Sequence, residues 1–73
     1  MAKNTAEVRT SIIRAIKKIG GPRKVSAAVD ISEANLKIWV RTGDLNDAKA
    51  INVFRFARAA GESIEAFLVV EDD

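Results

Sequence analysis

The feature that most constrains the fold of this chain is a short link at residues 30–32 (Asp-Ile-Ser) between two segments with helical periodicity. The first segment, about Pro22–Val29, begins with a proline at the first helical position, where its missing N–H costs nothing. The second segment, about Glu33–Arg41, repeats apolar residues at the spacing of one helix face. A link of three residues forces the two helices to cross steeply.

A steep crossing places demands on single positions near the link. A small residue is needed where the helices approach each other, and Ser26 is small. The turn needs a residue that tolerates positive φ, and Asp30 is a permitted choice, although a costlier one than Gly. Ile31 is the apolar residue expected to anchor the turn in the core. The expected buried side chains are Val25, Ala28 and Val29 in the first helix and Leu36, Trp39 and Val40 in the second.

A longer helix is predicted before this pair, from Thr5 to Ile19. Its apolar residues keep the 3.6-residue period, and Asn4 or Thr5 is expected to cap its start. Gly20-Gly21 is expected to end it, because Gly takes the left-handed conformation at a helix end without steric cost. Its expected apolar stripe is Val8, Ile12, Ala15, Ile16 and Ile19.

A fourth helix is predicted at about Ala48–Ala60, between the turn-rich stretch GDLND and Gly61. Ser63 opens a last apolar segment, IEAFLVV, which is predicted to begin as a short helix; its β-branched end LVV is also compatible with a strand. Four or five short helices with tight links predict an all-α, compact single domain over residues 1–73. The expected caps of the fourth helix are Asn46 or Asp47, and its expected inward residues are Ile51, Phe54 and Ala57.

The net charge of +2 conceals an asymmetry along the chain. Residues 1–58 hold all twelve Lys and Arg against five acids, a net charge of +7. Residues 59–73 hold five acids and no cation, a net charge of −5, and end in a short acidic tail at 71–73. A basic body favours an anionic partner, although ordinary solvated charges are an equal reading of the same pattern.

The stretch IGGPRKVSAAVDISEANLKIWVRTG (residues 19–43) resembles the helix-turn-helix of Cro/repressor-type DNA-binding proteins, and most of all the YdaS-like and Cro-like phage regulators. The Trp-Val-Arg-Thr-Gly run at 39–43 carries most of the likeness, and ARAAGESIEAFL (57–68) resembles the closing segment of that family. The likeness covers about residues 10–68. It implies a lambda-repressor-like DNA-binding fold with the helix-turn-helix at about 22–41, and a dimeric repressor of transcription that binds operator DNA. The departures are Asp30 for the usual Gly, Ser26 for the usual Ala, and the longer step through Thr42.

In such a family the second helix of the pair, here about Glu33–Arg41, is the recognition helix, and its N-terminal half enters the major groove. Lys37 and Arg41 carry the donors that suit guanine O6/N7 or phosphate, and Ala34 or Ile38 can rest on a thymine methyl. Glu33 can accept from cytosine N4 but repels phosphate. The base-contact residues that the resemblance implies are Ser32, Glu33, Ala34, Asn35, Lys37, Ile38 and Arg41.

Contacts to phosphate are expected from cations outside this helix, and the free N–H groups that open the second helix also attract phosphate. One small module contacts few phosphates and should bind weakly, so a homodimer on DNA is expected. The candidate phosphate contacts are Lys17, Lys18, Arg23, Lys24 and Lys49, and the candidate dimer interface is Phe56, Phe67, Val69 and Val70.

An enzyme is not expected, because the chain has no His, Cys or Tyr and no carboxylate pair in an apolar setting. No cofactor or metal is expected either: DLND at 44–47 is similar to a calcium loop but lacks its Gly and terminal Glu at the required spacing. No apolar run approaches the length of a membrane span, and a cytoplasmic protein is expected. The alternative function is an antitoxin-like or adaptor protein-interaction module on the same fold with little or no DNA binding.

Overall fold

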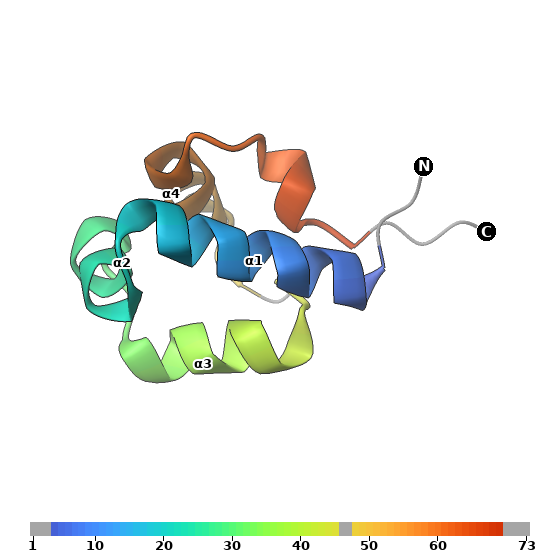
Figure 1. Cartoon of the computed structure of the whole chain (residues 1–73), viewed down its shortest axis with the longest axis horizontal. Helices are drawn as coiled ribbons and strands as arrows, with labels where there is room; N and C mark the ends of the chain where they lie inside the picture. Colours follow the sequence, from blue (N-terminus) through green and yellow to red (C-terminus); the bar gives the residue numbers. More distant parts are fainter. Residues whose placement is uncertain (1–3, 46–47, 70–73) are drawn as a thin grey trace.

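The part of the chain that the structure describes forms four α-helices and one short 3-10 helix (Figure 1). The computed structural model describes residues 4–45 and 48–69. Over these two ranges the chain forms no strand, and the predicted all-α class is confirmed. The elements are α1 (Thr5–Ile19), α2 (Pro22–Val29), α3 (Glu33–Thr42), α4 (Ala50–Ala60) and the 3-10 helix η1 (Ile64–Phe67).

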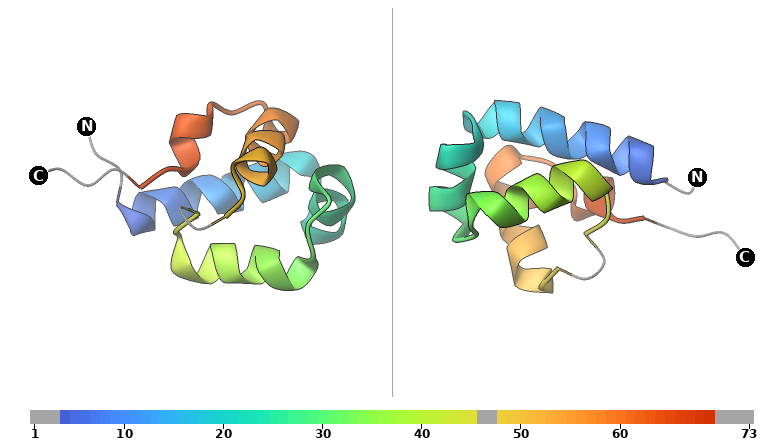
Figure 2. Two further views of the ribbon diagram at one scale, coloured as in Figure 1. Left: turned by 180° about the vertical axis from the view of Figure 1, so that it is seen from behind. Right: turned by 90° about the horizontal axis from the view of Figure 1, so that it is seen from below.

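Helix α1 is the element around which the others are arranged. It packs against α2, α3, α4 and η1, with α3 along one side of it and η1 along the opposite side (Figures 1 and 2). Helix α2 packs against both α3 and α4, whereas the backbones of α3 and α4 stay apart. The separation leaves one long face of α3 open to solvent.

The helix starts follow from local capping. Asn4 Oδ1 accepts a hydrogen bond from the Glu7 N–H at 2.9 Å, so α1 begins where the sequence predicts. Ser32 Oγ accepts from the Asn35 N–H at 3.1 Å and caps α3 in the same way. Ser63 Oγ accepts from the Glu65 N–H and opens η1, as predicted. Short polar side chains at these positions are therefore enough to fix three helix starts.

The predicted start of α4 is two residues too early. The helix begins at Ala50, and the residue at its cap position is Lys49, whose side chain makes no capping bond. Ala48 instead donates its N–H to the Leu45 carbonyl at 3.0 Å, and Leu45 is buried in the core. Asn46 and Asp47, the predicted caps, lie outside the described residues.

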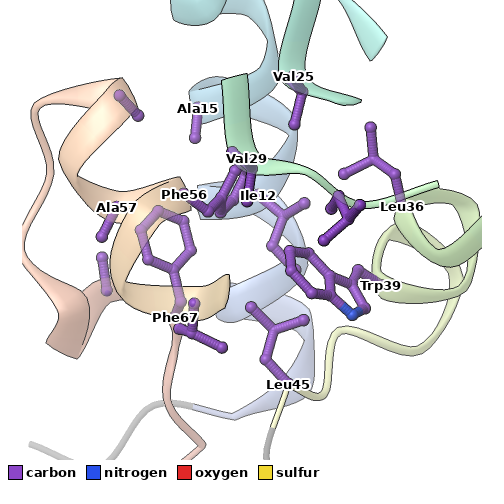
Figure 3. Close-up of a cluster of buried hydrophobic side chains, with 14 of the residues drawn as sticks. Ile12, Ala15, Val25, Val29, Leu36, Trp39, Leu45, Phe56, Ala57 and Phe67 are labelled. Atoms are coloured by element: carbon purple, nitrogen blue, oxygen red, sulfur yellow. The ribbon is translucent and has the colours of Figure 1, made fainter. Parts of the chain in front are cut away.

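One hydrophobic core holds the helices together (Figure 3). Its centre is aromatic: the Trp39 ring meets the Phe56 ring edge-on with centroids 5.6 Å apart, and the Phe56 ring lies 5.0 Å from that of Phe67. These contacts join α3, α4 and η1. The largest fully buried aliphatic residues are Ile12, Leu36, Leu45, Val8, Val25 and Val29.

The predicted inward face of α4 is wrong for two of its three residues. Ile51 and Phe54 are 52% and 51% exposed, and only Ala57 is buried. The buried positions are Val53, Phe56, Ala57 and Ala60, at the i, i+3, i+4, i+7 spacing of one face. Apolar residues stand on both sides of this helix, so periodicity alone left its rotation undetermined. The ring contacts of Phe56 with Trp39 and Phe67 decide which side faces the core.

The structure also differs from the predictions for Ala28 and for the segment LVV. Ala28 is exposed, because α2 buries only the i, i+4 pair Val25 and Val29 against its neighbours. Leu68 and Val69, the first two residues of LVV, follow η1 without regular secondary structure, and Val70 lies outside the described residues. Neither a helix nor a strand therefore forms over the described part of LVV.

Helix α3 ends where the chain passes closest to the start of α1. Gly43 takes the left-handed conformation (φ 65°) and donates its N–H to the Trp39 carbonyl at 2.8 Å. A Cβ at Gly43 would lie 2.2 Å from the backbone oxygen of Thr5. Only glycine allows this close approach, which ties the end of α3 to the first turn of α1.

Candidate nucleic-acid interface

The turn between α2 and α3 meets the predicted demands. Asp30 has φ 62°, which makes it the one residue other than glycine with positive φ among the residues described, and its N–H donates to the Ser26 carbonyl at 3.0 Å. The Ser26 hydroxyl donates to the Ile31 carbonyl, and the Ile31 side chain is buried. The small residue at 26 thus satisfies a carbonyl of the turn, while Ile31 fixes the turn to the core.

Helix α3 divides into two faces as the sequence predicts. Leu36 and Trp39 are buried and Val40 is partly buried against the core. The solvent face of α3, made of Ala34, Lys37, Ile38 and Arg41, is exposed, and Ile38 is 46% exposed. These four residues follow the i, i+3, i+4, i+7 spacing and project on the side opposite the core. The helix therefore presents one continuous strip with two cations and two apolar groups.

Two hollows border this strip. A smaller one, of about 210 Å³, lies toward α1 and the start of α2, and a larger one, of about 640 Å³, lies between α3 and the start of α4. Glu33 lines the smaller hollow, whereas Ser32 and Asn35 line the larger one. The seven predicted base-contact residues are thus brought together on one side of the molecule, four on the strip and three at its borders.

Ser32 has a structural role that is visible in the structure. Its Oγ accepts the hydrogen bond from the Asn35 N–H that caps α3. Its hydroxyl hydrogen is still available as a donor. Asn35 contributes only its backbone N–H to this cap, so its side-chain carboxamide takes no part in the cap bond. Both predicted contact residues thus retain groups that can meet a ligand.

A residue that the sequence prediction missed fixes the far end of the strip. Arg9 of α1 donates from Nη2 to the backbone carbonyl of Arg41 at 2.8 Å. This carbonyl belongs to the last turn of α3, whose free carbonyl groups attract cations. Thr42 adds a second constraint there by donating from its hydroxyl to the Ile38 carbonyl at 2.8 Å. Arg9 and Arg41 are 32 positions apart, and no local pattern pairs them.

Two of the five predicted phosphate contacts do not lie beside this strip. Lys18 donates to Glu62 Oε1 at 2.7 Å, and Arg14 donates to the same oxygen at 3.2 Å. Glu62 lies between α4 and η1, and η1 lies on the side of α1 opposite α3 (Figure 1). Lys17 lines a shallow hollow on α1 with Ile13 and Arg14, also away from α3. The hydrogen bond from Lys18, and after it that from Arg14, lowers the pKa of Glu62.

One of the other three predicted phosphate contacts borders the strip. Lys49 lines the larger hollow together with Asn35 and Ile38. Arg23 and Lys24 are exposed in the first turn of α2, directly after Pro22, but neither of these two cations lines the smaller hollow. A cation therefore stands beside the strip at Lys49, and two more lie in the helix that precedes the turn.

The predicted dimer interface is corrected by the core. Phe56 and Phe67 are both fully buried in the chain's own core, where their rings contact each other. A buried side chain offers no surface to a second molecule, so neither residue forms such an interface in this fold. Val69 is partly buried, and Val70 lies outside the described residues.

Three further findings concern membrane spans, metal sites and similarity to known proteins. Across residues 4–45 and 48–69, no helix combines the length and the apolar character that crossing a membrane requires. The same residues hold no group of three or more His, Cys, Asp or Glu side chains placed to bind a metal ion. Compared with models of protein families, with curated proteins and with solved structures, the chain has no match.

Proposed function

We propose that the protein is a sequence-specific double-stranded DNA-binding regulator of transcription, a Cro-like repressor that acts as a dimer. The observation that carries the proposal is the solvent face of α3. Lys37 and Arg41 alternate on it with Ala34 and Ile38, and Lys49 lines the hollow beside it. The α2–α3 pair would act as a helix-turn-helix, with α3 in the major groove.

Each residue of the solvent face of α3 suits one kind of base edge. Arg41 has the planar fork that pairs with guanine O6 and N7, and Lys37 carries a compact donor for the same edge or for phosphate. Ala34 allows the helix to come close to the bases, and Ile38 is placed to rest on a thymine methyl. Asn35, at the border, suits adenine N6 and N7.

Glu33 is expected to help the protein discriminate between DNA sequences. It stands in the first turn of α3, on the side of the smaller hollow that also holds Lys37. A carboxylate there accepts from cytosine N4 and is repelled by phosphate and by the acceptors of guanine. Glu33 would therefore select against sequences that bring phosphate or guanine O6 to this corner, rather than add to general affinity.

The positions of the cations set the expected strength of binding. Lys49 lines the hollow beside α3, and Arg23 and Lys24 are exposed in the first turn of α2. Each neutralised phosphate contributes a slope of roughly −0.9 to the plot of log affinity against log salt. A single copy with three to five such contacts binds weakly at physiological salt, which is why a dimer on two half-sites belongs to the proposal.

Selection of bound duplexes from a random pool tests the proposal, followed by fluorescence anisotropy of the selected duplex over a series of salt concentrations. We expect a palindromic motif and a log affinity that falls linearly and steeply with log salt. Enrichment of no motif, together with no duplex binding at low salt, would refute it.

A protein-interaction module of the antitoxin or adaptor kind is the second candidate. The exposed Ile38 on α3 and the exposed Ile51 and Phe54 on α4 favour it, because apolar side chains are typical of protein interfaces. Binding of this kind depends weakly on salt. The same salt series therefore separates the two functions.

A further inference from the structure

Helix α4 carries an exposed face that the proposed DNA contacts do not use. Ile51, Phe54, Arg55 and Arg58 follow the i, i+3, i+4, i+7 spacing on the side opposite the buried residues of the helix. We call these four residues the α4 outer face. Ile51 and Phe54 are each about half exposed, and neither lines the hollow beside α3.

The composition of the α4 outer face is that of a protein interface. Phe and Arg are enriched at the centres of such interfaces, and adjacent large apolar residues on a small soluble domain are an unfavourable surface without a partner. Within the described residues, neither Arg55 nor Arg58 forms an ion pair. A complementary partner must therefore offer apolar side chains and carboxylates close together.

The same chain contains such a segment. After the core residue Phe67, Leu68 and Val69 are only partly buried, and Glu65 beside them is exposed. The sequence continues with one more valine and the three acids at 71–73. In this segment apolar residues are followed directly by carboxylates. On the α4 outer face the apolar Ile51 and Phe54 are followed by two arginines, so the two are complementary in both apolar character and charge. The charge asymmetry of the chain, +7 before residue 59 and −5 from there on, thus gives the α4 outer face and the C-terminal segment opposite charges.

The geometry separates these two surfaces within one molecule. Helix η1 packs on the inner side of α4, where the Phe67 ring lies 5.0 Å from that of Phe56. From η1 the chain runs through Leu68 and Val69 toward the start of α1 (Figures 1 and 2). The α4 outer face lies across the helix from this path, so a second copy is better placed to supply the segment.

We infer that two copies of the chain pair reciprocally, with the segment 65–73 of each copy bound to the α4 outer face of the other. Each copy owns both surfaces, so a two-fold arrangement uses both pairs at once and closes the assembly. The inference deepens the proposed function by naming the surface through which a dimer forms. It is tested without DNA, so its failure leaves the proposal of DNA binding intact, and the reverse also holds.

Sedimentation velocity of the full chain over a range of protein concentrations at low salt tests the pairing. We expect a monomer–dimer equilibrium that weakens as salt is raised, because exposed ion pairs are screened. Phe54→Ser should raise the dimer Kd by about tenfold or more, since it removes an apolar contact from the centre of a small interface. Ile13→Ser is the matched control: it removes an exposed apolar side chain from α1, and the Kd should not change.

A charge swap identifies the occupant of the α4 outer face. Arg55→Glu with Arg58→Glu should abolish the dimer, as should Glu71→Lys with Asp72→Lys, and all four changes together should restore it. A wild-type chain that stays monomeric at the highest concentration overturns the inference. A dimer that is weakened by Phe54→Ser but not by Glu71→Lys with Asp72→Lys also overturns it. In that case the α4 outer faces of the two copies pair with each other. Failure of the fourfold variant to dimerise when its circular dichroism shows a folded chain also overturns it.

Discussion

Arg9 and Arg41, which carry like charges, are held together through a backbone group: the Arg9 guanidinium donates from Nη2 to the Arg41 carbonyl at 2.8 Å. The bond fixes the last turn of α3 to α1, while the Arg41 side chain remains exposed on the solvent face of α3. On the other side of this junction, Gly43 passes against the Thr5 carbonyl. The proposed recognition surface is therefore held at its C-terminal end by α1 as firmly as it is held at its start by the Ser32 cap.

Replacing Arg9 with Gln should remove this bond without disturbing the core. A hydrogen bond to a charged group contributes about 1.5–3 kcal/mol, and solvent exposure reduces this, so we expect a loss of about 0.5–1.5 kcal/mol in the free energy of unfolding. Urea denaturation followed by circular dichroism measures it. Arg23→Gln is the control, because it removes an exposed arginine of α2 for which no side-chain hydrogen bond or ion pair is found among the described residues. Equal stabilities for the two variants would show that the Arg9 bond contributes nothing.

Two glycines of nearly equal φ separate backbone strain from steric contact. Gly43 (φ 65°) and Gly61 (φ 68°) both end helices, but a Cβ at Gly61 meets nothing within 4 Å, whereas one at Gly43 meets the Thr5 oxygen. Gly61→Ala should therefore cost only the left-handed conformation, about 1–2 kcal/mol. Gly43→Ala should cost at least about 1 kcal/mol more, because the α1–α3 junction must also open. Urea midpoints of the two variants, compared at equal m-values, test the difference; a smaller loss at Gly43 would contradict the close approach.

The ion pairs of Glu62 predict how stability depends on pH. Its pKa is lowered from an ordinary value of 4.5, first by the hydrogen bond from Lys18 and then by that from Arg14. A carboxyl whose pKa is lower in the folded state stabilises the fold above its unfolded pKa, and this contribution disappears as the pH falls through the folded pKa. Stability of the wild type should therefore decline below about pH 4.5 more than that of Glu62→Gln.

Thermal melts of both proteins between pH 7 and pH 3 measure this effect. The two melting temperatures should differ at neutral pH and converge in acid, because Glu62 is neutral in both proteins once it is protonated. Raising the salt concentration at pH 7 should narrow the gap as well, since Arg14 and Lys18 are half exposed and their pairing is screened. A constant gap across the pH range would show that the variant acts through packing instead.

Trp39→Ala tests whether the core-facing side of α3 carries the stability of the domain. Trp39 contacts the Phe56 ring edge-on and is buried, so its truncation should cost about 3–5 kcal/mol. A domain of 73 residues lies near the lower end of the usual stability of about 5–15 kcal/mol, so the variant should be largely unfolded at 37 °C. Ile38→Ala, one position earlier but exposed, should cost less than about 1 kcal/mol. A Trp39→Ala protein that unfolds as cooperatively and as late as wild type would contradict the packing.

Local signals explain which features were predictable from the sequence. The starts of α1 and α3 follow from Asn4 and Ser32, because a capping side chain acts on backbone groups within one turn. The two faces of α3 were predictable because Leu36, Trp39 and Val40 form one apolar stripe and the cations Lys37 and Arg41 lie on the other side. Helix α4 has apolar residues on both sides, so its rotation depended on the Phe56 contacts, which join separate elements.

Contacts between charged side chains were the least predictable. The Lys18–Glu62 pair spans 44 positions and the Arg9–Arg41 bond spans 32. No periodicity or motif links such positions, and both contacts depend on how α1 lies between the other elements. For this reason the sequence placed Lys18 with the phosphate-binding cations and left Arg9 without a role.

Lys37→Ala and Arg41→Ala should weaken binding of the selected duplex while the fold stays intact. Both side chains are exposed on the solvent face of α3, so their removal leaves the core unchanged. A good pairing of a cationic side chain with a base is worth about 1–3 kcal/mol, which corresponds to a loss of roughly fivefold to 150-fold in affinity. Lys17→Ala is the matched control, since it removes the same charge from the outer side of α1 and should change the affinity less than about threefold. Anisotropy titrations at one fixed salt concentration compare the three. Equal losses in all three variants would mean that the chain attracts DNA by its net charge alone. The proposal that α3 is the recognition helix would then be wrong.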